Sequence, residues 1–181
     1  EDRSEDGFYP VKGKAMSYFT REDGKVIGLW KDAQVGHSDD AGKTWSRDGF
    51  GKALPINSAK YWGQKTEDGR YVIALNPTTR LRPPLAVVTS DDGEHFANPL
   101  VVHGELPDQR FSGYYKNMGP QYVRGIVEGN GNPPGDHLWL TYSVNKEDIW
   151  VSRIPTPITG EAEKGTITED FESTATSEMP V

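Results

Sequence analysis

The stretch Ser38–Trp45, which reads SDDAGKTW, occurs twice in this chain in closely similar form. The second copy, Thr89–Phe96, reads TSDDGEHF and keeps hydroxyl, acidic, glycine and aromatic residues in the same order. A repeat with a period of about 50 residues is typical of proteins built from stacked or radially arranged units. The two stretches therefore predict a supersecondary unit that is used more than once.

Each copy suits a tight turn between two strands. An aspartate can accept hydrogen bonds from the backbone N–H groups of its own turn, and a glycine allows a positive φ. The aromatic ring that ends the stretch can pack between neighbouring sheets. Such turns specify the fold and say little directly about catalysis. Aligned without a gap, the copies share these positions: Ser38, Asp40, Gly42, Thr44 and Trp45 in the first, and Thr89, Asp91, Gly93 and Phe96 in the second.

Composition favours an all-β chain. The 181 residues suggest one domain, and 20 glycines, 13 prolines and 10% aromatic residues favour many turns and strands. We find no window with the apolar spacing of an amphipathic helix. There is no cysteine, and the histidines have no metal-ligand spacing, so neither a metal nor another cofactor is expected. These histidines are His37, His95, His103 and His137.

The net charge of −7 is concentrated near the end of the chain. Residues 156–181 hold six acids and one lysine, whereas the rest is close to neutral. A nucleic-acid binder would show a basic stripe, and no apolar run approaches the length of a membrane span, so neither kind of partner is expected. We interpret 1–155 as the folded domain and 156–181 as a linker with an acidic tail, or as the start of a truncated downstream domain.

Strand signals fall into three groups, each resembling one antiparallel sheet. The first group ends with a predicted outer strand after the Ser38–Trp45 turn, and the third group lacks such a strand. The predicted strands are Ala15–Phe19, Lys25–Trp30, Ala33–Ser38 and Ser46–Leu54; then Lys60–Thr66, Arg70–Leu75, Leu85–Ser90 and Pro99–His103; then Gln121–Val127, His137–Val144 and Ile149–Ile154.

The repeated turn resembles the Asp-box of the sialidase superfamily, whose fold is a β-propeller. The segments Asp68–Pro77 and Leu138–Ser143 resemble family segments that precede a substrate-binding arginine and form the last hairpin. The resemblance implies a partial sialidase-like β-propeller of about three four-stranded blades, the C-terminal ones. The remaining blades would come from another chain or from missing sequence, since open edges are a liability. It also implies a secreted or periplasmic protein.

Sialidases bind a substrate carboxylate with three arginines and use a tyrosine nucleophile that a glutamate activates. On this resemblance Arg80 and Arg82 are candidate carboxylate ligands and Tyr122 is the candidate nucleophile. Trp62 and Tyr115 are further candidates for substrate contact. The activating glutamate would fall within Lys60–Gln64, which reads KYWGQ and has no carboxylate. A phenol with an ordinary pKa near 10 is a poor nucleophile at neutral pH without a base.

Three functions stay open at this point. The first is an exo-acting glycoside hydrolase on acidic glycans. The second is a polysaccharide lyase on uronate-containing glycans, with Tyr61 as catalytic acid or base and Arg80 or Arg82 neutralising the uronate. The third is a non-catalytic propeller that binds a glycan or a protein. Each candidate residue also has a non-functional interpretation. The arginines would then lie at the surface, and the tyrosines would serve only the packing of strands.

Overall fold

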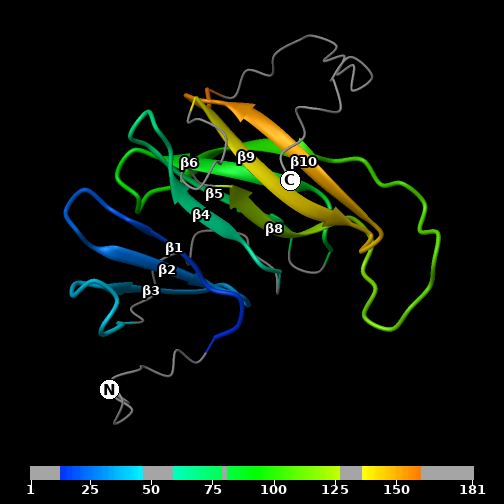
Figure 1. Ribbon diagram of the computed structural model, residues 1–181, viewed down its shortest axis with the longest axis horizontal. Coiled ribbons are helices and arrows are strands. Elements are labelled where there is room, and N and C mark those ends of the chain that lie inside the picture. The colour runs from blue at the N-terminus through cyan, green and yellow to red at the C-terminus, as the bar shows by residue number, and fades with distance from the viewer. Residues whose placement is uncertain (1–12, 47–58, 79–80, 127–135, 160–181) are drawn as a thin grey trace, which may run out of the picture.

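The computed structural model describes residues 13–46, 59–78, 81–126 and 136–159. Within these ranges ten strands form three antiparallel sheets, and there is no helix (Figure 1). This part of the chain accordingly contains no helix that could cross a membrane. The arrangement confirms the predicted all-β class and is that of a partial propeller, with sheets side by side in chain order.

The first sheet has the order β1-β2-β3, with strands Ser17–Thr20, Val26–Trp30 and Gln34–Ser38. Beyond the first turn motif, an isolated antiparallel bridge joins His37 to Ser46. The predicted outer strand Ser46–Leu54 lies outside the described residues after this bridge. The sheet therefore shows three strands of the predicted blade and the position at which a fourth would begin.

The second sheet is a complete four-stranded meander in the order β4-β5-β6-β7. Its strands are Trp62–Lys65, Tyr71–Leu75, Leu85–Ser90 and Ala97–His103. The predicted blade is confirmed here.

The third sheet has the order β8-β9-β10, with strands Pro120–Ile126, His137–Val144 and Asp148–Pro155. The pairing of β8 with β9 shifts between Gln121 and Arg124, which marks a β-bulge. The three described strands of this sheet agree with the three that the sequence predicts.

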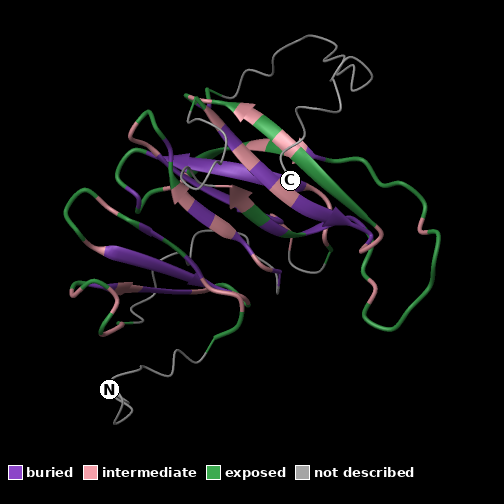
Figure 2. Cartoon of the chain, in the orientation of Figure 1, coloured by how far each residue is buried: buried purple, intermediate pink, exposed green. Residues whose placement is uncertain are grey.

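The hydrophobic core lies between the sheets. In β5 successive side chains point to opposite faces, as a strand requires. Ile73 and Leu75 join a cluster with residues of the first sheet, whereas Val72 and Ala74 join a cluster with residues of the third. All five residues of β5 are buried, and the central strands are accordingly purple in Figure 2. The middle sheet is thus packed on both faces, which explains its continuous apolar sequence.

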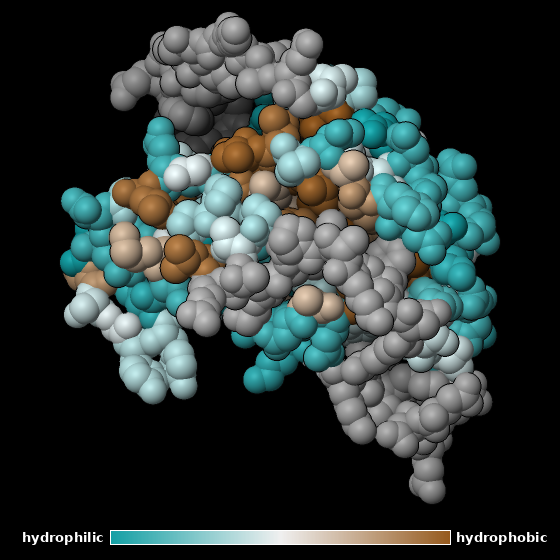
Figure 3. Space-filling model, turned by 180° about the vertical axis from the view of Figure 1, so that it is seen from behind, coloured by the Kyte–Doolittle hydropathy of each residue, from teal (hydrophilic) through white to brown (hydrophobic). Residues whose placement is uncertain are grey.

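The first strands of the sheets lie next to one another, β1 beside β4 and β4 beside β8. The last strands of the second and third sheets, β7 and β10, are largely exposed, and β10 exposes Ile149 and Val151. Seen from behind, apolar residues reach the surface in the middle of the described face, and hydrophilic residues dominate its edge (Figure 3). Ile158, beyond the predicted boundary at residue 155, is buried in the cluster between the second and third sheets. Residues 160–181 of the predicted tail lie outside the described residues.

The first turn motif forms the predicted network of hydrogen bonds. The Thr44 amide donates to Asp40 Oδ1 over 2.7 Å, and the Gly42 amide donates to Ser38 Oγ over 2.8 Å. The hydrogen bonds that Asp40 accepts lower its pKa to about 2, chiefly the bond from the Thr44 amide. The Trp45 ring then packs edge-on against Trp30, with 5.1 Å between ring centres.

The second turn motif corrects the ungapped alignment. Its hydroxyl and acid are Ser90 and Asp92, one residue after the predicted Thr89 and Asp91. The Gly93 amide donates to Ser90 Oγ over 2.9 Å, and the His95 amide donates to Asp92 Oδ1 over 2.8 Å. The second turn is one residue shorter than the first. One residue fewer separates Asp92 from Phe96 than separates Asp40 from Trp45.

Thr89 and Asp91, which the ungapped alignment assigned to the turn motif, have another role. Arg70 donates from Nε to Asp91 over 2.6 Å and from Nη2 to the Thr89 hydroxyl over 3.2 Å. A third bond from Arg70 Nη1 reaches the Ile158 carbonyl over 3.2 Å. Thr89 and Asp91 therefore help to attach the segment after β10 to the second sheet. Phe96 keeps its predicted position and packs against Phe19, with ring centres 6.2 Å apart.

Candidate functional site

Antiparallel pairing gathers certain loops at one end of the three sheets. Trp62 at the start of β4 pairs with Ala74 near the end of β5, and Pro120 at the start of β8 pairs with Val144 at the end of β9. The segment 76–78 after β5, the segment 81–84 before β6 and the turn 145–147 therefore lie at the same end as the beginnings of β4 and β8. Both turn motifs follow strands that run the other way, so they lie at the opposite end. We call the first of these ends the loop end.

Asn76 joins the segment 81–84, which precedes β6, to the start of β8. Its side-chain nitrogen donates to the carbonyls of Pro84 over 3.1 Å and Pro120 over 2.9 Å, and also to the Arg82 carbonyl. The contact is close, because a Cβ on Gly119 would lie 2.8 Å from Pro83 Cδ. These contacts hold Arg82 at the loop end near Tyr122.

Tyr122 has a strained backbone at this point. Its φ is +59°, a value that residues other than glycine seldom adopt, and it lies within the bulge of β8. The side chain is 41% exposed. Strained residues of this kind cluster at binding and catalytic sites, where the surrounding structure maintains them.

Three cationic side chains converge on Tyr122. The ammonium nitrogen of Lys60 lies 5.1 Å from the centre of the Tyr122 ring, and that of Lys146 lies 5.2 Å from it. The pKa of Tyr122 is lowered, first by a hydrogen bond from Lys146 and then by the charges of Lys146, Arg82 and Lys60. Partial burial lowers the pKa of Arg82, while Tyr122 and Asp32 act in the opposite direction. We call Lys60, Arg82, Tyr122 and Lys146 the cation–tyrosine cluster.

The turn between β9 and β10 aims Lys146 at Tyr122. Asn145 and Lys146 both have a φ of +56°, which is typical of a tight hairpin turn that follows the twist of its strands. Asn145 is buried; its side chain accepts from the Gly119 amide over 2.7 Å and donates to the Pro107 carbonyl over 2.8 Å. The turn is thereby fastened to the two segments that flank the cluster.

Glu147 anchors the long loop 104–119, which contains Tyr115. Its carboxylate is 3% exposed and accepts from the amides of Arg110 over 3.0 Å and Phe111 over 2.8 Å. Lys116 forms an ion pair with the same carboxylate. The backbone bond from Arg110 is the first cause of a pKa of about 2 at Glu147. Tyr115 is largely exposed, and its carbonyl accepts a hydrogen bond from Lys146, so this predicted contact residue borders the cluster.

Tyr61 has a structural role, contrary to its predicted role as catalytic acid or base. It is 3% exposed and belongs to the hydrophobic cluster between the first and second sheets. Its hydroxyl donates to the Gln34 carbonyl over 2.8 Å, and burial raises its pKa. The reason is its position next to Lys60 in an extended segment, where neighbouring side chains point to opposite sides. The other candidate arginine, Arg80, lies outside the described residues.

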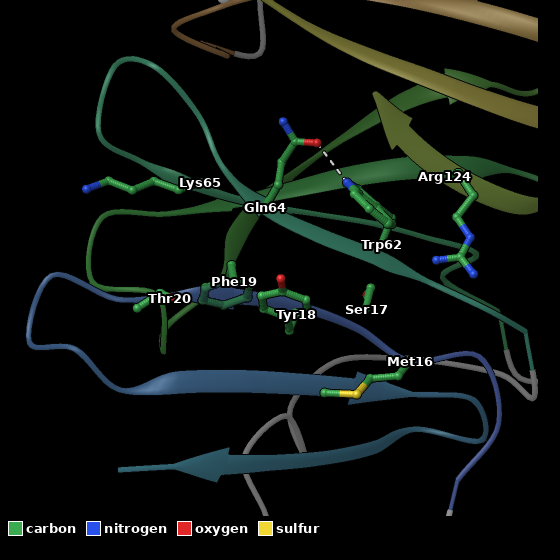
Figure 4. Close-up of a pocket in the computed structure, with 9 residues that line it drawn as sticks. All are labelled: Met16, Ser17, Tyr18, Phe19, Thr20, Trp62, Gln64, Lys65 and Arg124. Carbon is green, nitrogen blue, oxygen red and sulfur yellow. Dashed lines mark hydrogen bonds between the residues drawn. The ribbon is translucent and has the colours of Figure 1, made fainter. Parts of the chain in front are cut away.

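Trp62 lines a hollow of about 480 Å³ on the inner strands β1, β4 and β8. Figure 4 shows its indole between Gln64, to which Nε1 donates over 2.7 Å, and the Arg124 guanidinium. The Arg124 guanidinium carbon lies 5.7 Å from the Trp62 ring centre. A substrate role of Trp62 stays a prediction. Among the residues that the structure describes, no group of three or more histidines or acids could hold a metal ion.

Sequence reasoning singled out Arg82 and Tyr122, which the structure brings together, but it missed Lys60, Asn76 and Lys146. Lys146 lies in a turn that was predicted as a hairpin turn, and Lys60 lies in the stretch searched for a carboxylate. The order of the connections along the chain was a usable signal. In an antiparallel meander every second connection between strands lies at the same end of the sheet.

Comparison with solved structures gives a strong match. No family model matches the chain, and no curated protein matches it. A protein named "Sialidase" is 45% identical over 83% of this chain, with a TM-score of 0.73. A predicted glycoside hydrolase from Parabacteroides distasonis is 18% identical, with a TM-score of 0.42, over 78% of this chain and 49% of that one. The chain spans only 14% of the length of the first of these proteins.

Proposed function

From the premise that this chain is related to a sialidase and has a sialidase-like fold, we propose that its loop end binds an acidic sugar. Arg82 receives the carboxylate, and Tyr122 faces the anomeric carbon. A guanidinium suits the first role, because it stays charged and presents two parallel donors to a carboxylate. The proposed activity of the whole protein is exo-acting hydrolysis of acidic glycans.

The observation that carries this proposal is the convergence of Arg82 and Tyr122 from different sheets. Arg82 comes from the β5–β6 loop and Tyr122 from the bulge of β8, and each alters the pKa of the other. Lys60 and Lys146 add positive charge on the same side. A site of this composition favours an anionic ligand over a neutral one.

A uronate lyase is the second candidate, and the cations around Tyr122 favour it. In a lyase the tyrosine would abstract a proton next to the uronate carboxyl group, and Arg82 would stabilise the charge that develops. Tyr122 replaces Tyr61 in this role, because Tyr61 is buried. Products separate the two reactions: a lyase produces an unsaturated sugar that absorbs in the near ultraviolet, and a hydrolase does not.

A third candidate is glycan binding without catalysis. The stretch Lys60–Gln64 supplies no carboxylate to activate Tyr122, which favours this function over hydrolysis by the family's usual route.

Binding measured by calorimetry tests the proposal. The titrants are N-acetylneuraminic acid, galacturonic acid and, as a neutral sugar, galactose. We expect an acidic sugar to bind and galactose not to bind, and Arg82→Ala to weaken binding by about tenfold or more, as expected for a lost hydrogen bond to a charged group. Arg153→Ala is the matched control, since Arg153 contacts Trp139 in the third sheet. Equal binding of acidic and neutral sugars, or unchanged binding by Arg82→Ala, contradicts the proposal.

A further inference from the structure

Two lysines from different elements contact the ring of one tyrosine. Lys60 precedes β4 in the second sheet, and Lys146 lies in the β9–β10 turn of the third. Their ammonium nitrogens lie 5.1 and 5.2 Å from the centre of the Tyr122 ring, and both lysines are half-buried. Two sheets thus deliver positive charge to a single phenol.

The position of Lys146 is held from several sides. Its turn is fastened through Asn145 to Gly119 and Pro107, and its ammonium group donates to the Tyr115 carbonyl. Tyr122 is held as well, because Gln121 beside it is buried and donates to the Asn117 carbonyl over 2.7 Å. The ammonium group and the phenol are therefore brought together before any substrate binds, which reduces the entropy lost in their interaction.

The charges near Tyr122 favour its anion. A cation within a few ångströms stabilises a charged phenolate relative to the neutral phenol. Lys146 lowers the pKa of Tyr122 most, through a hydrogen bond, and the charges of Arg82 and Lys60 act in the same direction. Partial burial opposes them. The nearby carboxylate of Asp32 acts on Arg82 and on the buried Tyr61.

We propose that Lys146, supported by Lys60, favours the phenolate form of Tyr122, so that the tyrosine depends less on a carboxylate base beside it. The hydroxyl proton passes to solvent, and the phenolate oxygen keeps the electron pair. The use of this anion as nucleophile or base rests on the proposed function, whereas its formation does not. Lys146 acts through Tyr122 and is a positioning residue in this scheme.

A titration of tyrosinate absorbance in the near ultraviolet tests the proposal on the chain alone. The chain has 8 tyrosines, so the contribution of Tyr122 is the difference between the wild type and Tyr122→Phe. We expect this difference to titrate with a midpoint below 10, the ordinary pKa of a tyrosine. Tyr114→Phe is the matched control, because it removes a fully exposed tyrosine outside the cation–tyrosine cluster.

Lysine variants assign the cause of the lowered midpoint. In Lys146→Met the Tyr122 midpoint is expected to rise, in Lys60→Met to rise less, and in Lys146→Arg to return toward the wild-type value. Circular dichroism identifies any variant that has lost its fold, and Lys146→Arg keeps the test valid if Lys146→Met has done so. A Tyr122 midpoint at or above 10 in the wild type overturns the proposal, and so does a midpoint that Lys146→Met leaves unchanged.

The result is independent of the acidic-sugar experiment. If Tyr122 titrates normally while Arg82 still controls sugar binding, the phenolate proposal is wrong and the proposed function stands. If Tyr122 has a lowered midpoint and no acidic sugar binds, the phenolate proposal stands and the proposed function is wrong.

Discussion

The indole nitrogen of Trp62 lies 2.0 Å from the position that a Cβ on Gly125 would occupy. Gly125 belongs to β8 and Trp62 to β4, so this absence of a side chain allows the second and third sheets to approach. A second glycine does the same between the first and second sheets, since a Cβ on Gly63 would lie 2.5 Å from Leu29 Cδ1. Close contact of the inner strands thus depends on two glycines.

Gly125→Ala is expected to destabilise the chain by about 1–3 kcal/mol, as for other cases of overpacking. The new methyl group would displace the Trp62 ring and break its hydrogen bond to Gln64. Urea unfolding measures the change. Gly104→Ala is the control, because its Cβ would lie 3.5 Å from the Val101 side chain, an ordinary contact. Equal stability of the two variants would show that the sheets adapt to the added methyl group.

Ile158→Ala is expected to lower the free energy of unfolding by about 2–5 kcal/mol, because it deletes a buried side chain between two sheets. Ile149→Ala is the control in β10, where the side chain is 75% exposed, and its effect is expected to stay within about 0.5 kcal/mol. Similar values for the two variants would contradict the burial of Ile158 between the two sheets.

The turn motifs predict loss of stability at low pH. The pKa of Asp40 is about 2, first because the Thr44 amide donates to it, and that of Asp92 is also lowered, first by the His95 amide. An unfolded aspartate has a pKa near 3.9. Because the folded values are lower, this contribution is fully present above about pH 4 and is lost as the pH falls toward 2.

Thermal unfolding between pH 5 and pH 2 measures this contribution. The double variant Asp40→Asn, Asp92→Asn is expected to be less stable than the wild type at pH 5 and to show a smaller fall in melting temperature below pH 4. A fall as steep as that of the wild type would assign the acid sensitivity to other groups.

Trypsin tests the anchoring of the loop 104–119, because Arg110 and Lys116 are both cleavage sites within it. Glu147→Gln weakens the bonds that the Glu147 carboxylate accepts from these residues, so cleavage is expected to become several-fold faster. Asp148→Asn is the control, since it removes only the exposed ion pair with Arg110. Mass spectrometry locates the cuts, and an equal rate in both variants would contradict the anchoring role.

The strain at Tyr122 predicts a conflict between stability and function. Tyr122→Gly relieves the strain of a φ of +59°. The larger conformational freedom of glycine in the unfolded chain offsets part of this gain. We therefore expect the free energy of unfolding to rise by about 1 kcal/mol. Tyr122→Phe keeps the backbone strain and is the control. A loss of stability in the glycine variant would mean that contacts of the ring outweigh the strain.

Some of the candidate site was predictable, and the limits have physical causes. Arg82 and Tyr122 were singled out through the resemblance to sialidases, whose pattern implies an arginine before the second turn motif and a tyrosine before the last hairpin. Lys60 and Lys146 were missed, since their contact with Tyr122 joins segments far apart in the sequence. Tyr61 was misjudged because strand alternation assigns it and Lys60 to opposite sides, and the sequence does not say which side faces the core. In the second turn, both the hydroxyl and the acid occur as adjacent pairs, and only the hydrogen bonds identify Ser90 and Asp92.

The all-β class, all ten described strands and the repeated turn could be read from the sequence alone. These features depend on contacts within a few residues, such as alternation, positive φ at glycine and the capping of a turn by its own aspartate. The meeting of the β8 bulge, the β5–β6 loop and the β9–β10 turn at one end is visible in the folded structure and not in the sequence. That meeting depends on the close approach of sheets at Gly63 and Gly125 and on the tether of Asn76, which no local pattern encodes.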